Sequence, residues 1–117
     1  MPNPVVHFEV GGKDAQKLQR FYTDAFGWRV DADNPMNYGV VDTQCDGSGI
    51  NGGISPADDR PNWVTFYVEV DDPDAYLKKI EGMGGKTIRP TTVIPGMVTY
   101  ALFADPEGNV VGLVKSG

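Results

Sequence analysis

Two side chains that could do acid–base chemistry stand two residues apart near the start of the chain. They are His7 and Glu9, in a segment, 5–10, where apolar and polar residues alternate. Successive residues of a strand point to opposite faces, so His7 and Glu9 share one face of a sheet. A neighbouring carboxylate raises the pKa of an imidazole and orients its ring, as a general base requires. The pair predicts either such a site or a structural histidine hydrogen-bonded at the mouth of the sheet.

A second alternating segment, 63–70, adds aromatic and polar groups. If both segments turn Val6, Phe8, Val10 and Val64, Phe66, Val68 towards a helix, the opposite faces carry the remaining side chains. Those of the second segment are Trp63, Thr65, Tyr67 and Glu69. Rings supply contact area and a few polar groups fix orientation in small-molecule sites. We therefore predict that these four residues bind a planar or amphipathic ligand beside His7 and Glu9.

The elements that position these residues occur twice. Glu9-Val10 followed by Asp14-Ala15 returns as Glu69-Val70 followed by Asp74-Ala75. Each copy lies where an alternating strand leads into an amphipathic helix. Such half-domains lack complete cores of their own, so the repeat predicts two modules that share one core, with a concave ligand surface between paired sheets.

Capping residues mark both helices. Asp14 is suited to the N-cap of the first and Gly27 to its end, while Asp72-Pro73 opens the second and Gly84-Gly85 stops it. The predicted strands are 5–10, 28–30, 38–42, 50–54, 63–70, 86–88, 98–103 and 110–115. The chain is thus expected to be an α+β protein of one domain, 1–117, with βαβββ modules at about 4–54 and 63–116 joined by a linker at 55–62.

A loop is predicted between residues 90 and 97, where prolines and threonines gather. Ile94, Pro95 and Met97 make it partly apolar, and methionine adapts to varied ligands. We expect this segment to act as a lid and Met97 to contact the ligand.

Composition narrows the class of partner. The 117 residues are 40% hydrophobic and carry a net charge of −6, with Lys and Arg scattered along the chain. The sequence shows no stripe of basic residues that would indicate binding to nucleic acid or to an anionic membrane. No apolar run approaches the roughly 20 residues that a membrane span needs. One cysteine and no secretory leader indicate a cytoplasmic protein. A small neutral or apolar ligand is the expected partner.

These features together carry a family resemblance that covers nearly the whole chain. Its motifs are the strand with His7, the helix end Phe21-Tyr22 then Phe26-Gly27-Trp28, the segment Glu69-Val70-Asp71-Asp72, and the turn Asp105-Pro106-Glu107-Gly108-Asn109. The set resembles the vicinal oxygen chelate superfamily, which includes glyoxalase I, bleomycin-resistance proteins and extradiol dioxygenases. The resemblance implies paired βαβββ modules forming a curved mixed sheet around a ligand cavity, and a homodimer.

Metal-dependent members of that superfamily place a His or Glu on the first strand of each module and a carboxylate or similar ligand on each last strand. Position by position, only His7 matches. The other positions fall at Thr65, at Gly112, and at Gly52 or Gly53. Glycine cannot coordinate, and a divalent metal ordinarily needs three or more protein ligands. We therefore predict no cofactor, and keep a rearranged divalent site of His7, Glu9 and Glu69 as the alternative.

Other reactive residues have structural interpretations. Acidic surroundings argue against a nucleophilic Cys45 thiolate. Asp105 and Glu107 are expected to cap a hairpin. The glycines at 47, 49, 52 and 53 lack the Lys-Ser/Thr of a phosphate loop.

Three function classes remain. The first is a metal-free protein that sequesters a hydrophobic or aromatic compound, in the manner of bleomycin-resistance proteins. The second is a glyoxalase-like lyase or dioxygenase-like enzyme with a rearranged metal or a His7/Glu9 acid–base pair. The third is a non-catalytic accessory domain. Fold alone does not choose between them.

Overall fold

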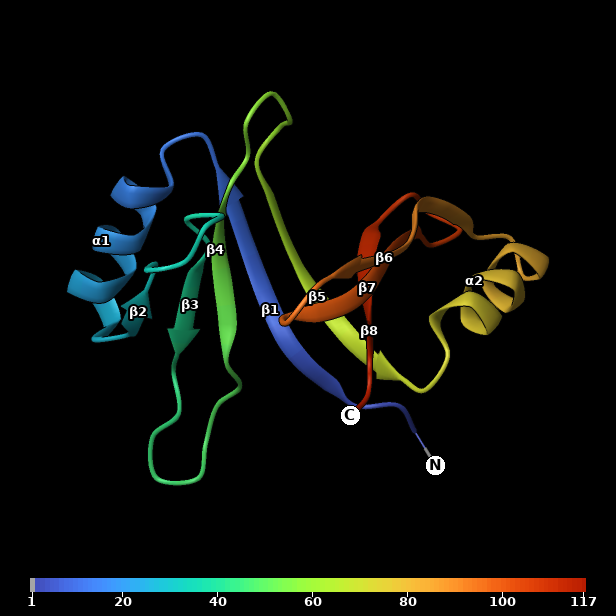
Figure 1. The fold of residues 1–117 in the computed structure, drawn as a ribbon, viewed down its shortest axis with the longest axis horizontal. Coiled ribbons are helices and arrows are strands. Elements are labelled where there is room, and N and C mark those ends of the chain that lie inside the picture. The colour runs from blue at the N-terminus through green and yellow to red at the C-terminus, as the bar shows by residue number, and fades with distance from the viewer. Residues whose placement is uncertain (1) are drawn as a thin grey trace. The chain divides into compact units, whose positions relative to one another are not determined.

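The computed structural model describes residues 2–117, which form two compact units (Figure 1). The N-terminal unit is His7–Val64, and the C-terminal unit is Thr65–Gly117 with residues 2–6. The strands are β1 (Val5–Gly12), β2 (Arg29–Asp31), β3 (Gly39–Asp42), β4 (Gly52–Pro56), β5 (Trp63–Val70), β6 (Lys86–Ile94), β7 (Val98–Ala104) and β8 (Val110–Lys115). The helices are α1 (Ala15–Phe26) and α2 (Pro73–Gly82). The α+β class and the order βαβββ in each half are confirmed.

The sheet of the N-terminal unit is mixed, in the order β2-β3-β4-β1. Strand β1 pairs parallel with β4, and β3 pairs antiparallel with both β4 and β2. Helix α1 covers one face (Figure 1). The core of the N-terminal unit consists of Val10, Val41 and Ile54, with Phe8, Leu18, Tyr22, Trp28 and Val30 packed against them. The odd-numbered residues of β1 are thereby left on the face opposite the helix, as predicted.

Helix α1 has the predicted caps. The Asp14 carboxylate accepts a hydrogen bond from the Lys17 N–H at 3.0 Å. At the other end Gly27 adopts a left-handed conformation, with φ of 72°, and its N–H donates to the Thr23 carbonyl at 2.8 Å. A side chain at Gly27 would be strained in that conformation, so the sequence ends the helix here.

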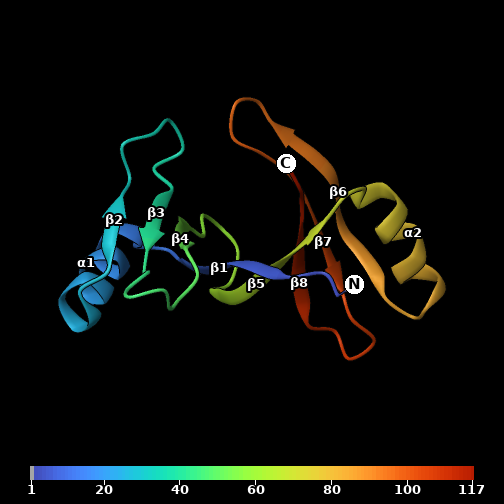
Figure 2. The same ribbon diagram turned by 90° about the horizontal axis from the view of Figure 1, so that it is seen from below.

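The sheet of the C-terminal unit runs in the order β5-β8-β7-β6, with β5 and β8 parallel and the other pairs antiparallel. Helix α2 lies along β6 in Figure 2. The Asp72 carboxylate caps it by accepting from the Ala75 N–H at 3.3 Å, and Pro73 follows in the first turn. The core comprises Val70, Leu77, Ala101 and Leu113, with Val68, Tyr76, Ile80 and Phe103 around them.

Four expectations are corrected. The modules do not share one core, because each unit has a core cluster of its own. Strands β1 and β5 begin 58 residues apart (Val5, Trp63), as do the N-caps Asp14 and Asp72, so the 60-residue motif repeat is two residues out of structural register. Residues 90–94, predicted as loop, belong to β6, which has register shifts on either side of Arg89. Val64 and Phe66, predicted to be buried on the helix side, are 78% and 43% exposed.

Candidate functional site

The open face of the N-terminal sheet carries a continuous chain of hydrogen bonds. His7 Nε2 lies 2.8 Å from the Tyr38 hydroxyl. That hydroxyl donates to Glu9 Oε2 at 2.9 Å, and the Trp63 indole N–H donates to Glu9 Oε1 at 2.8 Å. All four side chains are half-buried. The predicted proximity of His7 and Glu9 is real, but Tyr38 stands between the imidazole and the carboxylate.

Tyr38 was not foreseen as a site residue. It comes just before β3, and a turn built on Asn34 fixes its backbone. The Asn34 side chain donates to the Tyr38 carbonyl at 2.7 Å and accepts from the Tyr38 N–H at 3.0 Å. Asn is a frequent residue in such side-chain-closed turns. The sequence signal was therefore the turn that begins with Asn34-Pro35, with the aromatic residue four positions after Asn34.

Two glycines make room for the rings of this site. A Cβ added to Gly53, which pairs with Glu9 across β4 and β1, would overlap the Tyr38 hydroxyl. A Cβ added to Gly11 would overlap the Trp63 ring. Both contacts are far closer than real Cβ contacts allow, so glycine is required for Tyr38 and Trp63 to lie flat on the sheet.

The hydrogen-bond chain fixes where the protons are. Tyr38 has one hydroxyl proton and donates it to Glu9. His7 Nε2 must then be the donor in its contact with the Tyr38 oxygen. In the neutral imidazole this corresponds to the Nε2–H tautomer.

Burial lowers the pKa of His7 below 6.5, and this effect exceeds the opposing pull of the Glu9 charge. Glu9 raises the His7 pKa as predicted, but desolvation of the imidazolium outweighs the neighbouring carboxylate, so the net shift is downward. His7 is accordingly neutral at pH 7, and its Nε2 proton is held by the Tyr38 oxygen.

This lowered pKa predicts a pH-dependent stability. Between the folded pKa and 6.5 the unfolded chain binds more protons at His7 than the folded chain, so stability is fully present above pH 6.5 and falls as the pH drops through this window. Urea unfolding measures this effect. We expect the free energy of unfolding to fall more between pH 7.5 and pH 5.5 in the unmodified protein than in His7→Gln. Parallel pH profiles for the two proteins would contradict the assignment.

Trp63 lies against a charged neighbour and a surface hollow. The Arg60 guanidinium carbon is 4.3 Å from the centroid of the Trp63 ring, a cation–π distance. A hollow of about 250 Å³ lies beside the ring, lined also by Val10, Leu18 and Asn62. Arg60 belongs to the segment predicted as a linker, and its role was not foreseen.

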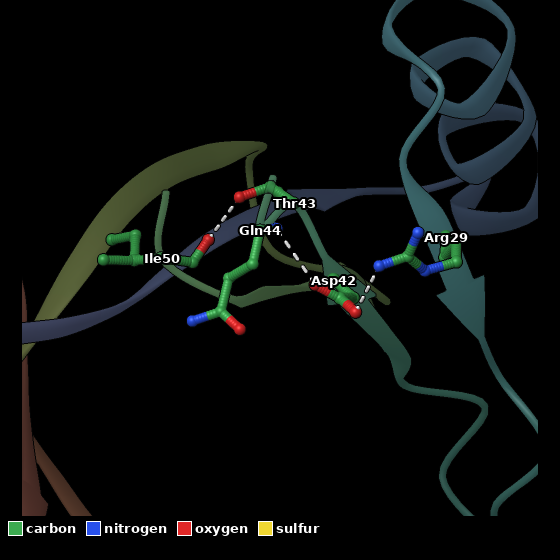
Figure 3. A network of polar contacts seen from close by, with 5 residues as sticks. All are labelled: Arg29, Asp42, Thr43, Gln44 and Ile50. Atoms are coloured by element: carbon green, nitrogen blue, oxygen red, sulfur yellow. Dashed lines mark hydrogen bonds and ion pairs between the residues drawn. The ribbon is translucent and has the colours of Figure 1, made fainter. Parts of the chain in front are cut away.

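A second polar network lies on the same open face (Figure 3). Arg29 of β2 and Asp42 of β3 face each other across the sheet, and their ion pair is 2.7 Å long. Asp42 also accepts from the Gln44 N–H at 2.9 Å, and Thr43 donates to the Ile50 carbonyl at 2.6 Å. The Arg29 guanidinium holds the pKa of Asp42 below its usual value. These contacts shape the β3–β4 loop and keep an arginine at the rim of the face.

The other predicted ligand residues lie in the C-terminal unit. Thr65 donates its hydroxyl to the Val110 carbonyl at 2.8 Å. The Tyr67 ring is only 8% exposed, covers Gly112, and meets the Tyr100 ring edge-on at 6.5 Å. Tyr67 and Tyr100 thus form an aromatic pair on the open face of this sheet. Tyr100 is a further residue that the sequence interpretation missed.

Glu69 and Met97 belong to the same unit. The Glu69 backbone is held by residues near the N-terminus, through its N–H to the Pro4 carbonyl at 2.9 Å and its carbonyl to the Asn3 amide at 3.2 Å. Met97 is 51% exposed and lies in the turn between β6 and β7, visible in Figure 2 as the connection of two long strands. The expected lid is therefore the tip of a hairpin, a more constrained element than a loop.

The structural interpretations of the turn residues fit the geometry. Asp105 accepts from the backbone N–H groups of Glu107 and Asn109, both at 2.9 Å, and from the Asn109 amide. The Asn109 amide, with these N–H groups, holds the pKa of Asp105 below its usual value. Cys45 is an exposed free thiol 3.8 Å from the Asp46 carboxylate.

The donor set does not fit a divalent metal. Among residues 2–117 no three His, Cys, Asp or Glu side chains converge on one point. The resemblance would place ligands where Gly53 and Gly112 occur, and the rings of Tyr38 and Tyr67 fill the space above those glycines. His7 Nε2 is hydrogen-bonded to the Tyr38 hydroxyl, and both Glu9 oxygens accept hydrogen bonds from protein donors. The absence of a cofactor itself remains a prediction.

Comparison with known proteins decides the family. Residues 5–113 match the family described as the Glyoxalase/Bleomycin resistance protein/Dioxygenase superfamily. The chain belongs to this superfamily. The vicinal oxygen chelate resemblance drawn from the sequence is thereby confirmed.

The curated relatives of this chain are longer proteins. It is 27% identical to the anthracycline biosynthesis protein DnrV of Streptomyces peucetius, over 99% of this chain and 48% of that protein. It is 32% identical to the putative glyoxylase CFP32 of Mycobacterium bovis, over 86% of this chain and 41% of that protein. The chain therefore spans about half the length of these superfamily relatives.

A solved structure supports the fold. The Mn(II)-bound glyoxalase of Novosphingobium aromaticivorans aligns with a TM-score of 0.67 at 19% identity, covering 97% of this chain and 38% of that one. At this identity the likeness concerns the superfamily fold alone. No helix within residues 2–117 is long and apolar enough to cross a membrane.

Proposed function

We propose that this superfamily member binds a small aromatic or amphipathic compound without a catalytic metal. The observation that carries the proposal is the state of Glu9. Both of its oxygens accept hydrogen bonds, one from Tyr38 and one from Trp63. The carboxylate therefore positions two aromatic side chains instead of coordinating a cation. The rings of Trp63 and Tyr38 on the open face offer the contact area.

The binding face combines two kinds of group. Trp63 and Tyr38 supply rings, while His7 and Arg29 supply a neutral imidazole and a cation. Small-molecule sites typically pair such apolar area with a few polar groups that set orientation. Thr65, Tyr67, Glu69 and Met97 remain proposed ligand contacts in the C-terminal unit.

The test is a titration with 2-methoxynaphthalene, an aromatic probe without a hydrogen-bond donor. We expect saturable thermal stabilisation and movement of the Trp63 indole N–H signal, because ligands that bind the native state raise its stability. Absence of any saturable effect from this and other two-ring compounds would refute the proposal. Trp28, on the helix side of the sheet, provides the reference indole signal.

Met97→Ala separates ligand contact from packing. Because Met97 is half-exposed at a hairpin tip, we expect the thermal midpoint without ligand to stay within about 2 °C while the probe binds more weakly. Equal losses of stability and binding would show that Met97 is ordinary packing.

A metal-free acid–base enzyme is the second candidate, and the continuous chain from His7 through Tyr38 to Glu9 favours it. His7→Ala distinguishes the two. A binding protein keeps most of its affinity for the donor-free probe, whereas an enzyme loses turnover. A glyoxalase-like or dioxygenase-like reaction with a rearranged metal has weaker support, since the donor set does not fit one.

We also propose a cytoplasmic homodimer. The exposed, unpaired Cys45 thiol suits a reducing compartment, and curated relatives of about twice this length are consistent with a superfamily architecture built from two such chains. Light scattering after size exclusion tests the dimer: a mass near that of one chain would contradict it.

A further inference from the structure

We propose a second binding site in the N-terminal unit, a groove beside helix α1 that binds aryl carboxylates. The α1 groove is a hollow of about 540 Å³ whose lining includes Gly12, Lys13, Lys17, Leu18, Phe21 and Asn62. None of these residues belongs to the proposed site on the open face. The inference therefore goes beyond the proposed function and does not depend on it.

Two chain connections form the groove at one end of the N-terminal unit. They are the β1–α1 connection and the segment 57–62, which lie at the same end of the unit in Figure 1. The Ala57 N–H donates to the Gly12 carbonyl at 2.9 Å and holds that segment against the end of β1. A Cβ added to Gly12 would overlap the Leu18 side chain. Leu18 therefore lies against the end of β1 and lines both this groove and the smaller hollow beside Trp63.

The groove offers apolar surface that the core does not use. Phe21 is 60% exposed although it belongs to the helix that covers the sheet. It follows Leu18 by three residues and Lys17 by four, and residues at these spacings are neighbours on a helix surface. A flat ligand that covers Leu18 and Phe21 removes this area from water.

The charges of the lining favour an anion. Lys13 and Lys17 both line the groove, and among residues 2–117 neither forms an ion pair. The lining contains one acidic residue, Asp14, whose carboxylate caps α1 by accepting the Lys17 N–H at 3.0 Å. The groove thus has a local excess of positive charge in a chain whose net charge is −6. A carboxylate complements the two ammonium groups.

These two features together define the ligand class. An aryl carboxylate has a flat body for Leu18 and Phe21 and one anionic group for the lysines. The Asn62 carboxamide, which lines the groove and the hollow beside Trp63, supplies a donor and an acceptor that can orient it. Small-molecule sites combine apolar walls with a few polar groups in this way.

The first test compares 2-naphthoate with its methyl ester, which has the same rings without the charge. We expect 2-naphthoate to bind at least about fivefold more tightly at low ionic strength. The preference should shrink at about 0.5 M salt, because salt screens exposed charges. NMR locates the site, since the backbone N–H signals of Gly12 and Lys17 should move during the titration.

A charge variant has a matched control in the other helix. Lys13→Gln/Lys17→Gln should weaken 2-naphthoate binding about fivefold or more. Lys78→Gln/Lys79→Gln removes the same charge from two exposed positions of α2 and should leave the affinity unchanged. An equal loss in both double variants would show that net charge alone attracts the probe.

The apolar wall has its own matched pair. Phe21→Ala should weaken 2-naphthoate binding about threefold or more, because apolar contact area is lost. Phe26→Ala should not, because Phe26 is 65% exposed on the same helix but does not line the groove. Thermal unfolding of both variants checks that the helix remains folded.

The outcomes separate this inference from the proposed function. No binding of 2-naphthoate, equal binding of the acid and the ester, or full affinity in Lys13→Gln/Lys17→Gln would overturn the α1 groove. Movement of the Trp63 indole signal without movement at Gly12 and Lys17 would overturn it too. None of these results bears on the open-face site, which 2-methoxynaphthalene tests separately.

Discussion

Glu9→Gln is expected to lower the free energy of unfolding by about 2 kcal/mol, because one charge-assisted hydrogen bond to a half-buried donor is lost. Glu9 accepts from Tyr38 and from Trp63 through separate oxygens. Glutamine has one acceptor oxygen, and its NH₂ group would face one of these donors. Tyr38 could turn its hydroxyl towards His7 only if His7 exchanged its tautomer.

The measurement is urea unfolding, with the Trp63 indole N–H signal as a local report. Glu107→Gln is the matched control, because the Glu107 side chain lies in an exposed turn. It should change stability by no more than about 0.5 kcal/mol. If Glu9→Gln were as mild as the control, the carboxylate would not be organising the site.

Two neighbouring glycines of β4 are expected to have different effects when replaced by alanine: one change lowers stability and the other disturbs the site. A Cβ at Gly52 would overlap the Phe8 ring, which packs in the core under α1. A Cβ at Gly53 would instead overlap the Tyr38 hydroxyl on the open face. We expect Gly52→Ala to cost about 2–3 kcal/mol of stability, since overpacking a core strains it.

Gly53→Ala should cost less stability but displace Tyr38. Its diagnostic result is a shift of the His7 ring signals, because His7 contacts the displaced hydroxyl, and Gly52→Ala should leave these signals unchanged in its folded fraction. Gly82→Ala in α2 is the control, since an added Cβ there meets nothing within 4 Å. That change should be neutral or stabilise by up to about 1 kcal/mol. An intact His7 signal in Gly53→Ala would show that Tyr38 does not need the glycine.

Local chemistry made much of the fold predictable. Both N-caps and the left-handed Gly27 follow from short-range hydrogen bonding and backbone sterics, which the sequence displays directly. The alternation of β1 likewise placed His7 and Glu9 on the open face. The two-residue error in the repeat escaped notice because a strand shifted by two residues keeps every side chain on the same face.

The extension of β6 was missed for a different reason. Pro90 suggested a break, but β6 is the edge strand of the C-terminal sheet, where a residue without an N–H need not interrupt a ladder. The register shifts around Arg89 accommodate it. An edge position follows from topology, which one local segment does not reveal.

The site depends on contacts distant in sequence. Tyr38 and Glu9 are 29 residues apart, and Trp63 and Glu9 are 54 apart. The sequence predicted the direction in which Glu9 shifts the His7 pKa but not the net shift, because adjacency to Glu9 is visible in the sequence while burial is not. The glycines were recognised as unable to bind a metal, but the rings that fill their places became evident only in three dimensions.

The proposed role of His7 and Glu9 is to serve a metal-free aromatic site. Its most direct test is elemental mass spectrometry of protein purified without chelator or affinity tag, followed by thermal-shift titration with nickel, zinc, manganese and iron(II). We predict no stoichiometric metal and no saturable stabilisation by these ions. Near-stoichiometric metal, or a saturable stabilisation that His7→Ala abolishes, would contradict the account and restore a metalloenzyme.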